Sequence, residues 1–141
     1  MSEKSDEFRG RVEELIAQFE DQENIVDRWI TRRYPKDLKD EARLLYTVPA
    51  LYLQRGTNNL MLDPLGYDLP GAEGAADLYR MPAFDPEATI YFYDGRWMIH
   101  RLEPPDNVAT FAVTEGQAVE LSVGTIGEVL DSIASHATAS S

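Results

Sequence analysis

The chain of 141 residues contains no cysteine. A disulfide framework, a thiolate zinc site, an iron–sulfur cluster and a cysteine nucleophile are therefore all excluded. Long apolar runs are also missing, since no stretch approaches the roughly 20 consecutive apolar residues that a membrane helix needs. The first ten residues are polar and charged, so a secretory signal is not expected. These absences predict a cytoplasmic protein that works away from membranes.

Positive charge is scarce, and it is absent from the last part of the chain. The formal net charge is −12, and no lysine or arginine follows Arg101. An excess of negative charge opposes binding to the phosphate backbone of nucleic acids, because that binding depends on clustered lysine and arginine. Nucleic acid is therefore not expected as a partner.

The common catalytic motifs are missing as well. The sequence has neither a phosphate-binding glycine loop nor the G-x-S-x-G turn of serine hydrolases. Only two histidines are present, His100 and His136, which limits general acid–base chemistry. The sequence therefore favours a non-enzymatic protein, although it leaves an enzyme open.

Composition and length predict one folded domain over residues 1–141. Apolar residues make up 43% of the chain, which is ordinary for a globular protein and high for a disordered one. A chain of this size buries a sufficient core without metal or disulfide support. We expect frayed ends at residues 1–5 and 138–141.

Helices are predicted at both ends of the chain. Apolar residues at helical spacing predict one long helix over residues 5–34, which Pro35 ends, and a short helix over residues 37–45. Near the C-terminus, Thr125 and Glu128 have the spacing of a capping box, and an apolar stripe follows them.

Between these helices the sequence alternates β-rich runs with turn signals. Because turns rather than helices join the runs, an antiparallel meander is predicted instead of a parallel sheet. Pro49 lies inside the first run and marks an edge strand or a bulge. The expected fold is therefore α+β: an antiparallel β-meander of six or seven short strands flanked by N-terminal helix or helices and a C-terminal helix. The predicted strands are residues 46–53, 60–63, 75–81, 88–93, 96–102, 108–113 and 118–123.

The clearest local signal is Asp94-Gly95, which stands between two β-rich runs. An Asp-Gly pair in this setting is the preferred two-residue hairpin turn, and such a turn fixes the strand register. Side chains alternate along a strand, so one face of the hairpin carries Ile90, Phe92, Trp97 and Ile99. This face is expected to join the core.

The other face of the hairpin is the preferred binding surface. It combines large contact area with polar ends, a composition typical of protein interfaces. The favoured function is thus a small acidic accessory protein that binds another protein, or a second copy of itself as a homodimer, without any cofactor. The residues expected to bind the partner are Tyr91, Tyr93, Arg96, Met98 and His100.

Two alternatives remain open. Asp63 ends one predicted strand, Asp77 lies within the next, and Asp85 lies in the turn that follows. Clustered carboxylates bind Mg²⁺ or Mn²⁺ in metal-dependent hydrolases and nucleases. The second alternative is a small-ligand-binding domain whose pocket is lined by Trp97, His100 and the loop over residues 64–74.

Overall fold

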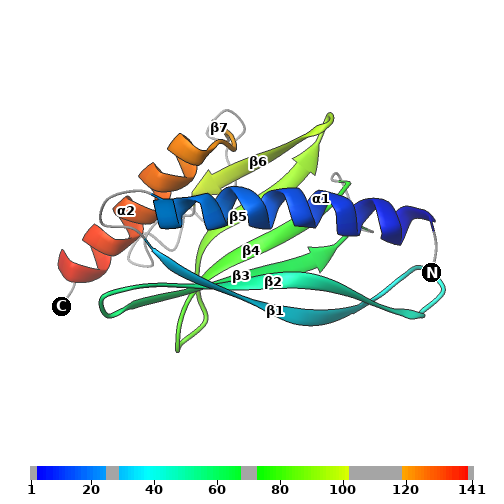
Figure 1. Cartoon of the computed structure of the whole chain (residues 1–141), viewed down its shortest axis with the longest axis horizontal. Coiled ribbons are helices and arrows are strands. Elements are labelled where there is room, and N and C mark those ends of the chain that lie inside the picture. The colour runs from blue at the N-terminus through cyan, green and yellow to red at the C-terminus, as the bar shows by residue number, and fades with distance from the viewer. Residues whose placement is uncertain (1–2, 25–28, 68–72, 102–118, 140–141) are drawn as a thin grey trace, which may run out of the picture.

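The computed structural model describes residues 3–24, 29–67, 73–101 and 119–139. Helix α1 (Glu3–Glu20) lies across one face of an antiparallel sheet, and helix α2 (Val123–Ala139) packs at the end of that sheet where β6 and β7 lie (Figure 1). A short 3-10 helix, η1 (Asp21–Asn24), follows α1 directly.

Seven strands form the sheet, and their spatial order equals their order in the chain. All neighbouring pairs are antiparallel. The predicted α+β meander with helices at both ends is therefore confirmed. The strands are β1 (Ile30–Lys39), β2 (Leu45–Arg55), β3 (Asn58–Gly66), β4 (Ala75–Arg80), β5 (Asp85–Tyr93), β6 (Arg96–Arg101) and β7 (Val119–Glu120).

One apolar core lies between the helices and the sheet. The stripe of α1 that the sequence predicts is buried completely, and the inward residues of α2 join the same cluster. Burying one large aliphatic or aromatic side chain contributes roughly 1.5–3 kcal/mol. Because α1 and α2 share this core, the two ends of the chain stabilise one another. The buried helix residues are Phe8, Val12, Leu15, Ile16 and Phe19 in α1, with Ile126, Leu130, Ile133 and Ala134 in α2.

The predicted helix over residues 5–34 is wrong in its second half. Helix α1 ends at Glu20, and Ile30 already belongs to β1. The polar segment that follows Glu20 interrupts the apolar stripe, and the segment from Ile30 gains a full antiparallel ladder with β2. Tertiary pairing therefore overrides the helical spacing of Trp29 and Ile30. At the other end the helix starts at Glu3, two residues before the predicted start.

The predicted short helix over residues 37–45 is a hairpin turn. The side chain of Asp40 accepts hydrogen bonds from the backbone N–H groups of Ala42 at 2.8 Å and Leu44 at 2.9 Å. Arg43 takes a left-handed conformation with φ of 64°, which closes the turn. An aspartate that bonds the backbone just ahead of it favours a turn over a helix, and this explains the difference.

Two prolines face each other across the β1–β2 ladder, Pro35 against Pro49. Neither has an N–H group, so this position must be a non-hydrogen-bonded pair, in which the missing donors point away from the partner strand. The outer side of β1 at Pro35 is the free edge of the sheet. On its other side, β2 pairs with β3 only from Leu51 onward. The predicted edge strand or bulge at Pro49 is therefore wrong, because β2 is an interior strand whose pairing with β1 and β3 shows no register shift, and Pro49 lies in the part of β2 that precedes the ladder with β3.

The β5–β6 hairpin has the predicted register. Phe92 pairs with Trp97 and Tyr93 with Arg96. Both turn residues have positive φ, 55° at Asp94 and 80° at Gly95, as the two-residue turn of a right-twisted hairpin requires. The local Asp-Gly signal was thus sufficient to assign the two faces of this hairpin.

Other strand boundaries differ by a few residues. The predicted loop over residues 64–74 begins later, because Pro64 and Gly66 still pair with β4, and residues 68–72 lie outside the described part. In the same way, the expected turn at residues 82–86 ends at Phe84, and Asp85 begins β5. The predicted strand over residues 108–113 lies outside the described residues, and of the strand over residues 118–123 the structure shows β7.

The cap of α2 lies three residues before the predicted one. The N–H of Thr125 donates to the Ser122 hydroxyl at 3.2 Å, and the N–H of Ser122 donates to the Thr125 hydroxyl at 2.8 Å. This reciprocal pair is a capping box with Ser122 at the cap position, in place of the predicted Thr125–Glu128 box.

Replacing Ser122 by alanine should therefore lower the free energy of unfolding by about 1 kcal/mol, because the first turn of α2 loses its acceptor. Urea denaturation followed by circular dichroism measures this. The matched control is Thr125→Ser, which keeps both hydroxyls and should cost much less. Equal stability of Ser122→Ala and the wild type would show that the cap contributes nothing.

Candidate functional site on the helix-free face

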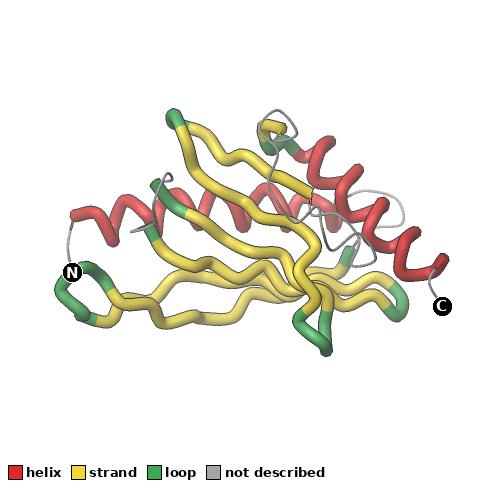
Figure 2. Tube along the Cα trace, turned by 180° about the vertical axis from the view of Figure 1, so that it is seen from behind, coloured by secondary structure: helices red, strands yellow, loops and turns green. Residues whose placement is uncertain are grey.

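The two faces of the sheet have different surroundings. Helix α1 covers one of them, and the indole N–H of Trp97 on that face donates to the backbone carbonyl of Arg11 at 2.9 Å. Seen from behind, the strands lie in front of α1 and no described helix crosses them (Figure 2). We call this second side the helix-free face. Its residues include Tyr34, Tyr52, Met61, Asp63, Asp77, Tyr79, Thr89, Tyr91, Tyr93, Arg96, Met98 and His100.

The five predicted partner-binding residues all lie on the helix-free face, but their exposure differs. Tyr93 is 58% exposed and Arg96 is exposed, whereas Tyr91 and Met98 are partly buried. His100 is only 3% exposed, and its Nδ1 is buried without a hydrogen-bond partner in the described part of the chain. His100 is therefore not an accessible contact residue, and the accessible part of the predicted surface lies toward the turn.

Register aligns the side chains of the helix-free face in rows that cross the strands. One row is polar and contains Asp63, Asp77, Thr89 and His100, which are successive partners on β3, β4, β5 and β6. The row on one side of it contains Tyr52, Met61 and Tyr79, and the row on the other side contains Ala75, Tyr91 and Met98. Adjacent strands lie about 4.8 Å apart, so neighbours in a row are in direct reach. A polar row thus runs between two rows rich in tyrosine and methionine.

Asp63 and Asp77 are the charged centre of the polar row. Lys36 reaches across β2 from the edge strand, and its ammonium lies 2.5 Å from a carboxylate oxygen of Asp63. On the other strand, the hydroxyl of Tyr79 donates to the carboxylate of Asp77 at 2.7 Å. Two carboxylates therefore face each other across the β3–β4 ladder, and among the described residues Lys36 forms an ion pair with Asp63 but not with Asp77.

The position of Asp77 disfavours its charged form. Burial raises the pKa of the Asp77 carboxyl, and this effect outweighs the Tyr79 hydrogen bond, which lowers the pKa. The nearby negative charge of Asp63 raises the pKa further, and the positive charge of Lys36 lowers it. Burial also raises the pKa of Tyr79, with the Asp77 carboxylate as the second cause. An ionised carboxylate in such a position reduces folding stability.

Asp77→Asn should therefore raise the melting temperature by about 1–3 °C at pH 7, because the amide keeps an acceptor for Tyr79 and removes the charge. A carboxyl whose pKa is raised on folding binds its proton more tightly in the native state. The stability of the wild type should thus increase as pH falls through that raised pKa, and the advantage of Asp77→Asn should disappear. Thermal unfolding of both proteins across this pH range checks the sign. A melting temperature that falls on substitution at pH 7 would contradict it.

Of the three predicted metal ligands, the structure brings two together. Asp63 and Asp77 are direct cross-strand partners, but Asp85 pairs with Arg80, three residues further along β4. In the described segments, no group of three or more histidine or acidic side chains is placed to hold a metal ion. The Mg²⁺ or Mn²⁺ site therefore lacks a third protein ligand in this arrangement.

Aromatic side chains extend the helix-free face toward β1. The rings of Tyr34 and Tyr52 stack with centroids 4.4 Å apart. Tyr52 is 43% exposed, while Phe84, on the turn before β5, is 54% exposed and packs edge-on against Tyr79. The sequence analysis missed Tyr34 and Tyr52 as surface residues. The signal was present in the β-forming residues Ile30, Thr31 and Tyr34 just before Pro35.

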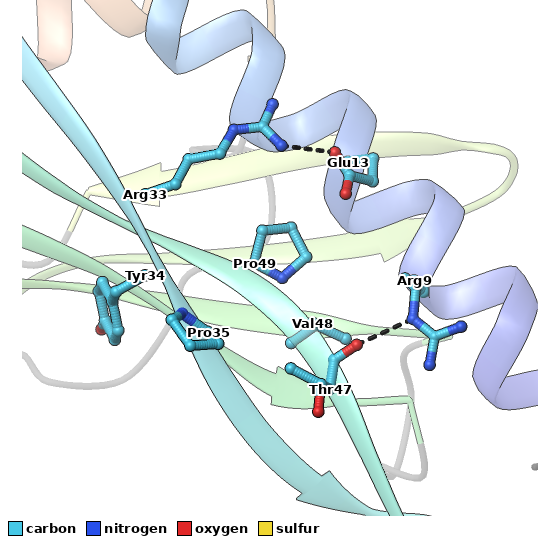
Figure 3. A pocket seen from close by; sticks show the side chains of 8 residues that line it. All are labelled: Arg9, Glu13, Arg33, Tyr34, Pro35, Thr47, Val48 and Pro49. Carbon is cyan, nitrogen blue, oxygen red and sulfur yellow. Dashed lines mark hydrogen bonds and ion pairs between the residues drawn. The ribbon is translucent and has the colours of Figure 1, made fainter.

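A separate cleft of about 330 Å³ lies between α1 and the β1–β2 hairpin (Figure 3). The facing prolines and Val48 line its apolar part. Arg33 bridges to Glu13 at 2.7 Å on one side, and Arg9 donates to the backbone carbonyl of Thr47 at 2.8 Å on the other. Arg33 also binds Glu20 through two hydrogen bonds of 2.8 and 2.7 Å. Both arginines thus hold the helix to the hairpin, and the cleft lies between these two bridges.

Trp97 and His100, which were expected to line one pocket, lie on opposite faces of β6, and residues 68–72 of the predicted lining loop lie outside the described part. Trp97 lies on the core side of β6, and His100, three residues later, lies on the helix-free side. Residues separated by an odd number of positions in a strand point to opposite faces of the sheet, so these two side chains do not line the same cavity. The cleft at Pro35 and Pro49 is formed by α1, β1 and β2, and not by β6.

Comparisons of the chain with family models, with curated proteins and with solved structures find no match. Among the described residues, no helix is both long and apolar enough to cross a membrane.

Proposed function

We propose that this protein is a non-enzymatic accessory protein that binds another protein through its helix-free face. The observation that carries the proposal is the set of exposed and half-exposed tyrosines on the one sheet face that no described helix covers. Tyrosine supplies a large, rigid contact area at low entropic cost and keeps a polar end for water, so it suits a surface that is solvated in the free state.

The edge of the sheet is a poorer docking site than its face. Strand β1 is the long edge strand at the opposite side of the sheet from the two-residue strand β7, and a strand added to β1 would need its outward N–H groups. At Pro35 this donor is missing, and the N–H of Thr31 already donates to the Glu23 carboxylate at 2.7 Å. Proline and occupied donors on an edge discourage strand addition. A partner is therefore expected to contact side chains of the helix-free face.

Photo-crosslinking tests the proposal. Benzoylphenylalanine is placed at Tyr52 or Tyr93 on the helix-free face, and at Glu14 or Ala17 on the exposed side of α1 as controls. Both face positions should crosslink to the same protein in native cells, and the two α1 positions should not. The captured protein is then purified and must bind the unmodified chain in solution. Absence of a shared crosslink from the two face positions would overturn the proposal.

A small-ligand-binding function is the second candidate, and the cleft at Pro35 and Pro49 favours it. Its volume of about 330 Å³ lies at the lower end of the range for ligand sites. A ligand with an apolar body would lie on the two prolines and Val48. A thermal-shift screen of metabolites tests this, with Thr47→Trp, which places a large ring at an exposed position on the rim of the cleft, as the variant that should abolish any shift.

A further inference from the structure

The charges at the centre of the helix-free face do not balance. Lys36 neutralises Asp63, whereas the ion pairs of the described residues include no cation for Asp77. The nearest basic residue along β4 is Arg80, which binds Glu87 at 2.7 Å. Arg80 lies three residues after Asp77 in the strand, so its side chain starts from the opposite face of the sheet. A half-buried carboxylate with only a hydroxyl partner is therefore present on the surface proposed to bind a protein.

The surroundings of Asp77 favour a planar cation. Tyr79 lies two residues along the same strand and donates to the carboxylate, and Tyr52 stands in the same row as Tyr79. A guanidinium pairs with a carboxylate and also stacks on aromatic rings, which an ammonium does less well. The chemistry at this position thus matches an arginine side chain better than a lysine or a metal ion.

The net charge points to the same class of partner. Each chain carries −12, so two copies repel, and a second copy would bring another Asp77 to the same surface. A basic polypeptide would instead be attracted by the whole molecule and would neutralise Asp77 on contact. Charge complementarity therefore selects a partner distinct from this chain.

From these observations we infer that the helix-free face recognises a basic polypeptide segment, and that an arginine of this segment binds at Asp77 beside Tyr79. The inference rests on the proposed function and specifies the partner. The segment's apolar residues would contact Tyr52 and Tyr93, while Lys36 holds Asp63 in place.

NMR titration with a short probe tests this inference directly. The probe is the capped peptide acetyl-Leu-Arg-Leu-amide, and the control probe replaces arginine by citrulline, which has nearly the same shape without the charge. The arginine peptide, added up to about 10 mM, should give saturable shifts at the backbone amides of Asp63, Asp77 and Thr89. The citrulline peptide should bind at least about fivefold more weakly.

Two variants distinguish binding at Asp77 from general attraction by the negative charge of the chain. Asp77→Asn should abolish the saturable shifts, whereas Glu14→Gln, which removes an exposed charge from α1, should leave them unchanged. Absence of saturable shifts, equal binding of both peptides, or shifts centred on α1 would overturn the inference. If the crosslinks from Tyr52 and Tyr93 persist in that case, the proposed function stands and only the arginine specificity falls. A crosslink to a second copy of the chain would also overturn the inference.

Discussion

Replacing Trp97 by alanine is expected to lower the free energy of unfolding by about 3–5 kcal/mol. The indole is 3% exposed, meets Phe92 edge-on with ring centroids 5.3 Å apart, and donates its N–H to the Arg11 carbonyl. The substitution therefore removes packing, an aromatic contact and a hydrogen bond that joins β6 to α1. Urea denaturation followed by circular dichroism measures the loss.

The control for this experiment lies on the same hairpin. Tyr93→Ala removes a ring of comparable size from the helix-free face, where it is 58% exposed, and should change the free energy of unfolding by less than about 0.5 kcal/mol. The contrast tests the assignment of the two faces. Similar losses at Trp97 and Tyr93 would mean that Tyr93 also supports the fold, and the helix-free face would then not be a free surface.

The double substitution Tyr52→Ala and Tyr93→Ala is expected to weaken binding of the captured partner at least about 100-fold. Buried tyrosines at interfaces commonly contribute 2 kcal/mol or more when truncated, and each 1.4 kcal/mol is a factor of ten in affinity. Isothermal titration calorimetry with the purified partner measures the effect. The melting temperature should fall only slightly, through loss of the Tyr34–Tyr52 stack.

Leu44 provides the matched control for the tyrosine pair. It is 56% exposed at the β1–β2 turn, away from the helix-free face. Leu44→Ala should change the affinity less than about threefold. Equal losses for Leu44→Ala and for the tyrosine pair would place the binding surface elsewhere or make it unspecific.

The two faces of the sheet differ in how they affect stability. The face under α1 carries the apolar side chains that stabilise the fold, from Phe8 and Val12 to Trp97 and Ile99. On the other face, Asp77 reduces stability because burial disfavours its charged form and the ion pairs of the described residues include none to Asp77. Groups that reduce stability are common where a surface is built for binding. This difference is why the proposed function is assigned to the helix-free face.

Sequence patterns predicted the parts of the fold that depend on local chemistry. Asp94 and Gly95 determine their own turn, so the register of β5 and β6 followed from two residues. The meander followed from the short turns between strands. For β1 the prediction failed, because Trp29 and Ile30 fit helical spacing and strand pairing equally, and only the ladder with β2 decides between them.

The same limit applies to the candidate site. Asp63 and Asp77 were expected to meet because they lie on successive strands, and the register places them opposite each other. The contribution of Lys36 could not be predicted, since this residue was placed between two predicted helices rather than on the edge strand. Burial of His100 likewise depends on surroundings that alternation along one strand does not reveal.

Cysteine labelling in native extract tests the central claim most directly. The chain has no cysteine, so Asn59→Cys on the helix-free face and Ala17→Cys on α1 each create a single reactive site at an exposed position. The account predicts that maleimide labels both equally fast in the purified protein, and that native extract slows labelling at Asn59→Cys at least about tenfold and not at Ala17→Cys. Protection at Ala17→Cys with undiminished labelling at Asn59→Cys would contradict it.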